Sequence, residues 1–363
     1  MRIRHEEAGV IYMETIVRKI TNTEKDREIY EKAGEILRKG GLVAFPTETV
    51  YGLGADALDA EASSKIYAAK GRPSDNPLIV HIADVNALYD LASEVPDKAI
   101  RLAEKFWPGP LTMILKKQDK VPDSITGGLG TVAVRMPSHP VASELIRSSG
   151  VYIAAPSANT SGKPSPTRAE HVINDLSGKI DMIIQDDTVD IGVESTIIDL
   201  SEEVPTILRP GYITKEMFEE VIGTTIIDPA IMGSLKEGIV PKAPGMKYKH
   251  YAPNADVTIV EGPHDKVVDY INDAVARKEM QGHRCAVMAT DETKGKYVCK
   301  DIVSAGHKDD ELSVARNLYA ILRDFDKQNI EYVYSESFET KNVGQAVMNR
   351  LIKAAGHKVI KLD

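Results

Sequence analysis

Two basic residues, a hydroxyl and an amide gather in one short, proline-rich stretch of the sequence. Lys70 and Arg72 stand two positions apart, and Ser74 and Asn76 follow among prolines. Cations on a stiff loop bind a phosphate at little entropic cost, because few backbone states are lost on binding. A lone lysine is usually solvated. It is therefore the combination, rather than either cation alone, that predicts a site for a small anion.

A second polar loop follows the apolar run 151–155. It offers Ser157, Asn159, Lys163 and Ser165 among three prolines, a set of donors that suits phosphate or ribose. Gly162 and Lys163 do not form a P-loop, because the G-x-x-x-x-G-K-[ST] spacing is absent.

Two arginines lie in or at the end of apolar runs. Arg135 is inside the run 131–136, and Arg209 ends the run 206–209. A buried arginine needs a partner, which for Arg135 is either a ligand carboxylate or an internal salt bridge. Arg209 is either a surface charge or a second cation of a cleft.

The elements that must position these residues can be predicted from the same region. Apolar strands are expected over 42–45 and 78–82, with a helix over 60–69 that ends at Gly71. Pro46 stops the first strand, so Thr47 to Thr49 are displayed at its end. Gly52 and Gly54 predict a tight turn or a close approach of the backbone to a ligand.

Length and composition limit the class of protein. The chain has 363 residues, 42% hydrophobic and 27% charged, with a net charge of -9, which is typical of a soluble globular protein of about two domains. The acidic balance argues against stable binding of long nucleic acids. Cys285 and Cys299 are expected to be inert thiols in a reducing compartment, hence a cytoplasmic protein. No apolar run is long enough for a membrane span, and residues 1–12 are no signal peptide.

The pattern predicts three parts. Residues 13–223 form a first, larger domain, 224–254 a linker, and 255–363 a smaller domain. In the last part, strands and helices alternate, which predicts a parallel, Rossmann-like α/β sheet. It lacks G-x-G-x-x-G after a strand, so no dinucleotide is assigned. The linker holds Tyr248 and Tyr251 between prolines, and we expect it to act as a lid over the binding site of the first domain.

Seven motifs in order make a specific resemblance that covers residue 13 to the end. They are PTETVYGLG, KGRPSDNPLIVHI, WPGPLT, VAVRMP, APSANTSGKPSPT, GVESTI and LRPG. Together they resemble the YrdC-like L-threonylcarbamoyl-AMP synthases, and APGMKYKHYAP with the Rossmann-like part resembles the longer, two-domain form. Ala243 stands where many relatives have serine. The resemblance implies an α/β fold, with a YrdC-like twisted-sheet catalytic domain that has a concave basic cleft, plus the smaller domain.

The resemblance also implies a reaction, a nucleotidyl transfer. L-Threonine and bicarbonate give threonylcarbamate, which attacks the α-phosphorus of ATP and releases pyrophosphate. Threonylcarbamoyl-AMP then passes to the tRNA threonylcarbamoyl-transfer machinery, which modifies adenosine 37 of tRNAs that read ANN codons. The threonine or carbamate side would be lined by Thr49, His81, Arg135, Ala155 and Ser195. The ATP side would be lined by Lys70, Arg72, Asn76, Thr131, Ser157, Asn159, Ser165, Arg209, Tyr248 and Tyr251.

No protein metal site is expected, since no Asp/Glu cluster is evident; Mg²⁺ would come mainly on the ATP phosphates. Two alternatives remain open. One is an RNA-binding module, against which the acidic charge and the lack of stacking motifs count. The other is a carbamoyl-transfer domain of the hydrogenase-maturation type, which would need cysteine pairs that this sequence lacks.

Overall fold

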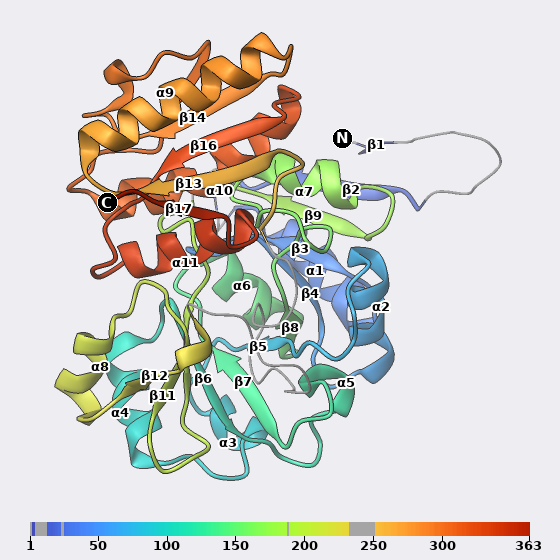
Figure 1. Cartoon of the computed structure of the whole chain (residues 1–363). Helices are drawn as coiled ribbons and strands as arrows, with labels where there is room; N and C mark the ends of the chain where they lie inside the picture. The colour runs from blue at the N-terminus through green and yellow to red at the C-terminus, as the bar shows by residue number, and fades with distance from the viewer. Residues whose placement is uncertain (1, 4–12, 23–24, 187–188, 232–250) are drawn as a thin grey trace. The chain divides into compact units, whose positions relative to one another are not determined.

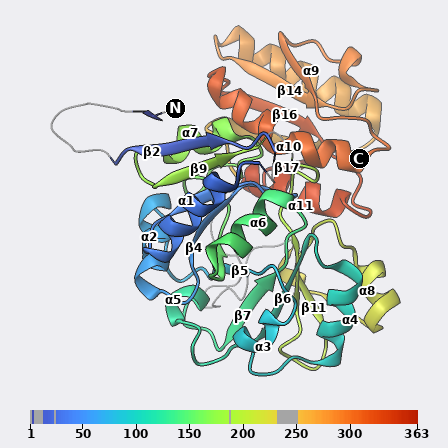
Figure 2. The same cartoon turned by 180° about the vertical axis from the view of Figure 1, so that it is seen from behind.

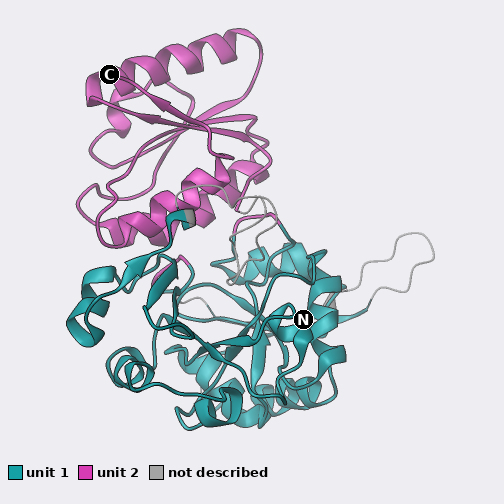
Figure 3. Ribbon diagram, turned by 60° about the horizontal axis from the view of Figure 1, so that its bottom comes forward, with its two compact units in different colours: residues 1–161, 165–190, 194–247 teal, residues 162–164, 191–193, 248–363 magenta. Residues whose placement is uncertain are grey.

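The computed structural model describes residues 2–3, 13–22, 25–186, 189–231 and 251–363 (Figure 1). The chain divides into two compact units (Figure 3). Unit 1 comprises residues 1–161, 165–190 and 194–247, and unit 2 comprises residues 162–164, 191–193 and 248–363. Most of the predicted linker, including Tyr248, lies outside the described residues. The predicted domain boundaries and the lid therefore stay predictions.

Unit 1 is built on a mixed sheet, which has twelve strands in the described residues (Figures 1 and 2). In spatial order these are β1 (Arg2–Ile3), β2 (Thr15–Lys19), β9 (Met182–Gln185), β3 (Val43–Phe45), β4 (Gly52–Asp56), β8 (Ile153–Ala155), β5 (Ile79–His81), β7 (Thr131–Arg135), β6 (Leu111–Lys116), β10 (Thr196–Asp199), β11 (Thr206–Arg209) and β12 (Ile226–Ile227). At its centre β5 runs parallel to β7, and β6 runs antiparallel to β7.

Helices lie between these strands in the sequence. They are α1 (Arg27–Arg38), α2 (Ala60–Lys70), α3 (Ala87–Leu91), α4 (Asp97–Phe106), α5 (Asp123–Thr126), α6 (Pro140–Ser149), α7 (Ala169–Leu176), α8 (Lys215–Ile222) and the 3₁₀ turn η1 (Pro229–Ile231). The Asp59 side chain caps α2 by accepting from the N–H groups of Glu61 and Ala62, and Gly71 ends it with φ 61°. This confirms the predicted helix and its glycine stop.

The tight turn predicted at the two glycines is wrong, because both lie in β4. A Cβ on Gly54 would lie 2.6 Å from Ile153 Cγ2 and 2.9 Å from Phe45 Cε1, and one on Gly52 would lie 3.2 Å from Phe45 Cζ. The glycines are needed because the Phe45 ring and β8 pack directly against this strand.

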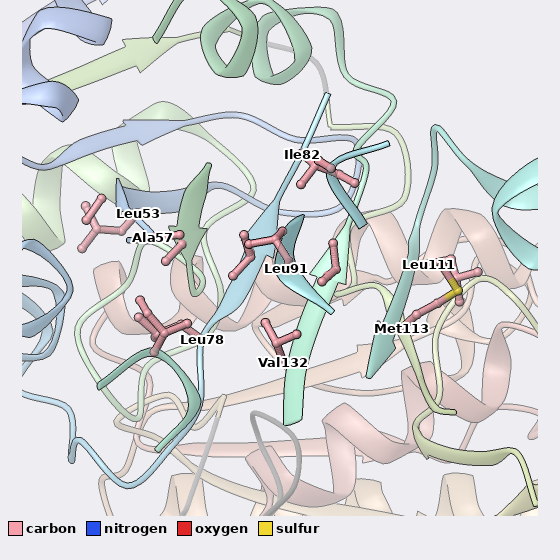
Figure 4. Close-up of a cluster of buried hydrophobic side chains, with 14 of the residues drawn as sticks. Leu53, Ala57, Leu78, Ile82, Leu91, Leu111, Met113 and Val132 are labelled. Atoms are coloured by element: carbon pink, nitrogen blue, oxygen red, sulfur yellow. The ribbon is translucent and has the colours of Figure 1, made fainter. Parts of the chain in front are cut away.

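The sheet is buried on both faces. One face packs against a large cluster that includes Leu53, Leu78, Met113 and Val132 (Figure 4). At β3, β8 and β9 the other face is covered by α1 and α6, which pack side by side (Figure 2). Further along that face, a smaller apolar cluster consists of Ile79, Ile114, Ala133, Ile197 and Leu208. Arg135 shares this face with Ala133, and His81 shares it with Ile79, since residues two positions apart on a strand point to the same side.

Unit 2 contains a sheet of five described strands, all parallel. In spatial order these are β15 (Asp301–Ser304), β14 (Cys285–Ala289), β16 (Tyr332–Glu336), β13 (Asp256–Glu261) and β17 (Val359–Lys361). Figure 3 shows helices on both faces of this sheet, as parallel strands require. They are α9 (His264–Met280), α10 (Glu311–Lys327) and α11 (Gly344–Ala354), with the 3₁₀ turn η2 (Lys294–Lys296). The predicted parallel α/β architecture is confirmed.

Unit 2 also includes residues 162–164. The Arg323 guanidinium on α10 donates from Nε (3.0 Å) and Nη2 (2.6 Å) to the carbonyl oxygen of Pro164. The N–H of Ala252 donates to the carbonyl oxygen of Gly162.

Among the described residues, no helix has both the length and the hydropathy to cross a lipid bilayer.

Candidate active site

A row of residues in register crosses four strands of unit 1. Arg135 on β7 is opposite Thr112 on β6, Thr112 is opposite Ile197 on β10, and Ile197 is opposite Arg209 on β11. Neighbouring strands are spaced by about 4.8 Å, so the Cα atoms of the two arginines lie about 14 Å apart. Both arginines are buried. The row therefore presents two cations, one at each end, beside the smaller apolar cluster.

The guanidinium of Arg135 is held by a carboxylate and a hydroxyl. Its Nη2 lies 2.7 Å from Oε1 of Glu48, and its Nη1 donates to Thr49 Oγ1 at 3.0 Å. Its Nε–H has no acceptor among the described residues. The internal salt bridge considered from the sequence is thus present. A buried donor without an acceptor is costly, and a ligand carboxylate would supply that acceptor. Binding of a ligand carboxylate by Arg135 therefore stays a prediction, and this geometry favours it.

The charge states at this end of the row follow from burial and from Arg135. Burial raises the pKa of Glu48, but the Arg135 charge and hydrogen bond outweigh it, and the net pKa lies below its ordinary value. Burial, followed by the Arg135 charge, lowers the pKa of His81 to about 3. His81 pairs with Arg135 in the sheet, and its Nδ1 lies 3.0 Å from the Ile79 carbonyl oxygen. At neutral pH, Glu48 is therefore a carboxylate, Arg135 a guanidinium cation and His81 a neutral imidazole.

At the other end of the row, Ser195 links Thr112 to Arg209. Ser195 Oγ lies 2.8 Å from Thr112 Oγ1 and accepts from Arg209 Nη2 at 3.0 Å. Arg209 Nε also donates to the Ser195 carbonyl oxygen at 3.0 Å. The register between β10 and β11 shifts at Ile197 and Ile198, so Leu208 is an extra residue on β11. This bulge lets Arg209 share a face with Ser195.

Lys70 anchors the loop that follows β8. Its ammonium group, at the C-terminal end of α2, is buried and donates to the backbone carbonyls of Ser157 and of Asn159, the latter at 2.6 Å. Ser157 Oγ donates to Asn159 Oδ1 at 2.6 Å. The structure therefore brings Lys70, Ser157 and Asn159 together, and their binding of an anion stays a prediction.

The loop after α2 carries the other predicted residues of this region. Arg72 is half-buried and donates from Nη2 to the carbonyl oxygens of Asn76 and Pro77, both at 3.3 Å. The Asn76 carbonyl also accepts from the Tyr67 hydroxyl at 3.1 Å. The Asn76 side chain is buried, and its Oδ1 has no partner among the described residues, so it offers an acceptor to a ligand.

The remaining predicted residues are spread more widely. Thr131 begins β7 and is on the same face as Arg135, two side-chain repeats away. Ala155 ends β8 opposite Ile79. Ser165 Oγ donates to Oε1 of Glu194 at 2.6 Å. Tyr251 is buried in unit 2, where its ring lies 5.3 Å from that of Tyr319. Its contact with a nucleotide stays a prediction.

Three polar residues of the site were assigned no role from the sequence: Glu48, Glu194 and Thr112. Each is buried and bonded to a predicted residue. A signal for Glu48 did exist, because an acid directly after a buried strand must have a cationic partner. The described residues contain no group of three or more His, Cys, Asp or Glu side chains able to hold a metal ion.

Two family models match the chain in succession. The Sua5–YciO–YrdC model, described as telomere recombination, matches residues 35–211. The model described as threonylcarbamoyl-AMP synthase, C-terminal domain, matches residues 213–356.

Known proteins are similar over almost the whole chain. Threonylcarbamoyl-AMP synthase of Pyrococcus abyssi is 51% identical over 91% of this chain and 95% of its own length. The Bacillus subtilis enzyme of the same name is 49% identical over 91% and 94%. A crystal structure of Pyrococcus abyssi Sua5 complexed with L-threonine is 48% identical, with a TM-score of 0.89 over 96% of this chain and 99% of that one. The chain therefore belongs to the threonylcarbamoyl-AMP synthase family.

Proposed function

We propose that this chain is an L-threonylcarbamoyladenylate synthase, an enzyme of the nucleotidyltransferase class. It converts L-threonine, bicarbonate and ATP into threonylcarbamoyl-AMP and pyrophosphate. The product serves the partner machinery that places the threonylcarbamoyl group on adenosine 37 of tRNAs reading ANN codons. Membership of the family and the L-threonine complex of a 48% identical relative support this proposal.

The single observation that carries the proposal is the row from Arg135 to Arg209. One buried guanidinium with an unfilled Nε–H suits the carboxylate of threonine, since arginine binds carboxylates through paired donors. The second, beside Ser195, suits the charge that develops when the carbamate oxygen attacks phosphorus. The smaller apolar cluster beside this row lowers the polarity around the reacting groups.

On the nucleotide side, Arg72, Asn76, Ser157, Asn159 and Ser165 contact ATP in this proposal, and Lys70 holds the loop of Ser157 and Asn159 in place. Phosphoryl and nucleotidyl transfers depend mainly on positioning and electrostatic stabilisation. This fits a site whose nucleophile, the carbamate oxygen, belongs to the substrate. The low pKa of Glu48 and the pKa of about 3 for His81 make both weak bases at neutral pH.

Mg²⁺ fits this site as a companion of ATP. The ion typically keeps several waters and binds substrate phosphates through them or directly. In this proposal it is ligated mainly by the phosphates and offsets their negative charge. That the predicted linker, with Tyr248 and Tyr251, acts as a lid that excludes water stays a prediction. The described cysteines are free thiols, which suits a reducing location such as the cytoplasm.

The direct test is synthesis by the purified full chain. With ATP, L-threonine and ¹³C-bicarbonate, we expect pyrophosphate and an adenylate whose mass includes one ¹³C. Reactions that lack threonine or bicarbonate are the controls and should give neither product. Pyrophosphate that forms at the same rate without threonine would contradict the proposed function.

A further inference from the structure

Glu48 is a buried acid that the proposed reaction does not yet use. Its carboxylate lies between Thr47 and Thr49 in the segment after β3, and its exposed fraction is 3%. Burying a carboxylate is costly unless it is paired. Its partner, Arg135, is buried as well, and the 2.7 Å separation of Glu48 Oε1 from Arg135 Nη2 makes them a direct ion pair.

The pair decides the net charge at this end of the site. Thr47 and Thr49 are neutral and hydrogen-bond each other at 2.8 Å. His81, opposite Arg135 in the sheet, is also neutral, since its pKa is about 3. Glu48 and Arg135 together therefore sum to zero charge, while Arg135 keeps an Nε–H without an acceptor.

Beside the neutral Glu48–Arg135 pair, a simple carboxylate and an α-amino acid should bind with different affinities. A simple carboxylate would add an unbalanced negative charge to a buried site that already holds Glu48, and an uncompensated buried charge is strongly unfavourable. An α-amino acid brings its own ammonium group and leaves the site neutral. Without Glu48, the site would hold only the Arg135 cation and would favour a plain anion.

We propose that Glu48 is a specificity-determining residue, which makes the Arg135 end of the site select a zwitterionic amino acid over a carboxylate that has no amine. This rests on the proposed function, because it takes the amino acid to be the threonine of that reaction. Glu48 acts through charge balance, and Arg135 remains the group that receives the carboxylate.

The experiment compares two ligands that differ in the amine alone. L-Threonine and 3-hydroxybutanoate share the carboxylate, the hydroxyl and the carbon chain. Their dissociation constants for the full chain are measured by calorimetry without ATP. For the unmodified protein, we expect threonine to bind at least about tenfold more tightly.

Glu48→Gln preserves the shape and removes the charge. We expect threonine binding to weaken about 30-fold, as for the loss of one member of a buried charge pair. Binding of 3-hydroxybutanoate should be unchanged or tighter, so that the preference for threonine disappears. A purely structural role would weaken both ligands by one factor, and this outcome, like an unchanged preference, would overturn the proposal.

Two further variants serve as controls for Glu48→Gln. Glu48→Asp keeps the charge and should keep the preference; if it loses the preference, shape rather than charge decides and the proposal is wrong. Glu336→Gln changes another buried glutamate, which in unit 2 accepts from Thr293 Oγ1 at 2.6 Å, and its affinities for both ligands should match those of the unmodified protein.

If the unmodified protein binds threonine and makes the adenylate while Glu48→Gln keeps its preference for threonine, this inference alone fails. If the unmodified protein binds no threonine, the proposed function fails with it.

Discussion

The ammonium group of Lys70 lies 2.6 Å from the backbone carbonyl oxygen of Asn159, although 89 residues separate the two in the sequence. It also donates to the Ser157 carbonyl, and its exposed fraction is 2%. A cation placed in this way ties the C-terminal end of α2 to the loop after β8. Two polar stretches that the sequence suggested separately thus lie in contact in the fold.

Replacement of this cation should affect both folding and binding. In Lys70→Met, the loop carbonyls lose a charged donor, and we expect the free energy of unfolding to fall by about 3 kcal/mol. ATP affinity should fall too, because the loop of Ser157 and Asn159 loses its anchor. Urea unfolding and ATP titration measure the two effects. Lys32→Met, which removes an exposed surface pair on α1, should change stability by no more than about 0.5 kcal/mol. Equal stabilities for the two variants would refute the anchoring role.

Arg72 tests the nucleotide side of the proposal. Its guanidinium donates from Nη2 to the carbonyl oxygens of Asn76 and Pro77, both at 3.3 Å. Because Arg72 is half-buried in a loop, Arg72→Ala should fold normally by circular dichroism, yet make the adenylate about 100- to 1000-fold more slowly, as when a donor to a charged transition state is lost. Arg27→Ala, at an exposed position on α1, should keep the full rate. A loss below about threefold in Arg72→Ala would exclude this role.

The β4 glycines predict a packing effect that is independent of catalysis. In Gly54→Ala, the new methyl group would lie 2.6 Å from Ile153 Cγ2, so strands β4 and β8 must shift. Overpacking of this kind costs about 1–3 kcal/mol of unfolding free energy. The matched control is Gly130→Ala, where the added Cβ has no neighbour within 4 Å, and we expect it to be neutral or slightly stabilising. Urea denaturation of both variants is the measurement, and equal midpoints would contradict the close packing of β4.

The pKa of His81 predicts how stability depends on pH. The unfolded chain binds a proton on this histidine near its ordinary pKa of 6.5, whereas the folded protein does so only at about 3. The folded state is therefore favoured fully above pH 6.5, and this contribution declines as pH falls from 6.5 towards 3. The slope from this one group approaches about 1.4 kcal/mol per pH unit.

Unfolding free energies between pH 6.5 and 4.5 test this, since carboxylates with ordinary pKa values titrate mainly below that range. His81→Phe should show a flatter profile than the unmodified protein. His357→Asn replaces an exposed histidine and should leave the profile unchanged. Parallel profiles for the unmodified protein and His81→Phe would show that the pKa of His81 is the same in the folded and unfolded states, which would contradict the lowered pKa.

The sequence alone determined the elements and the kinds of side chain they display. Apolar runs, Pro46 and Gly71 marked β3 and the end of α2, because strand periodicity and helix stops are local properties of the chain. Arg135 could be recognised in the same way as a buried cation in need of a partner.

Only the tertiary structure decided which groups meet. It selected Glu48 as the partner of Arg135, a pairing between distant segments that no local pattern contains. It also placed Arg209 beside Ser195 through the bulge at Leu208, since alternation along a strand assigns a face only while the register is regular. Likewise, Gly52 and Gly54 read as a turn from the sequence, and their true role depends on Phe45 and Ile153, which pack against them from neighbouring strands.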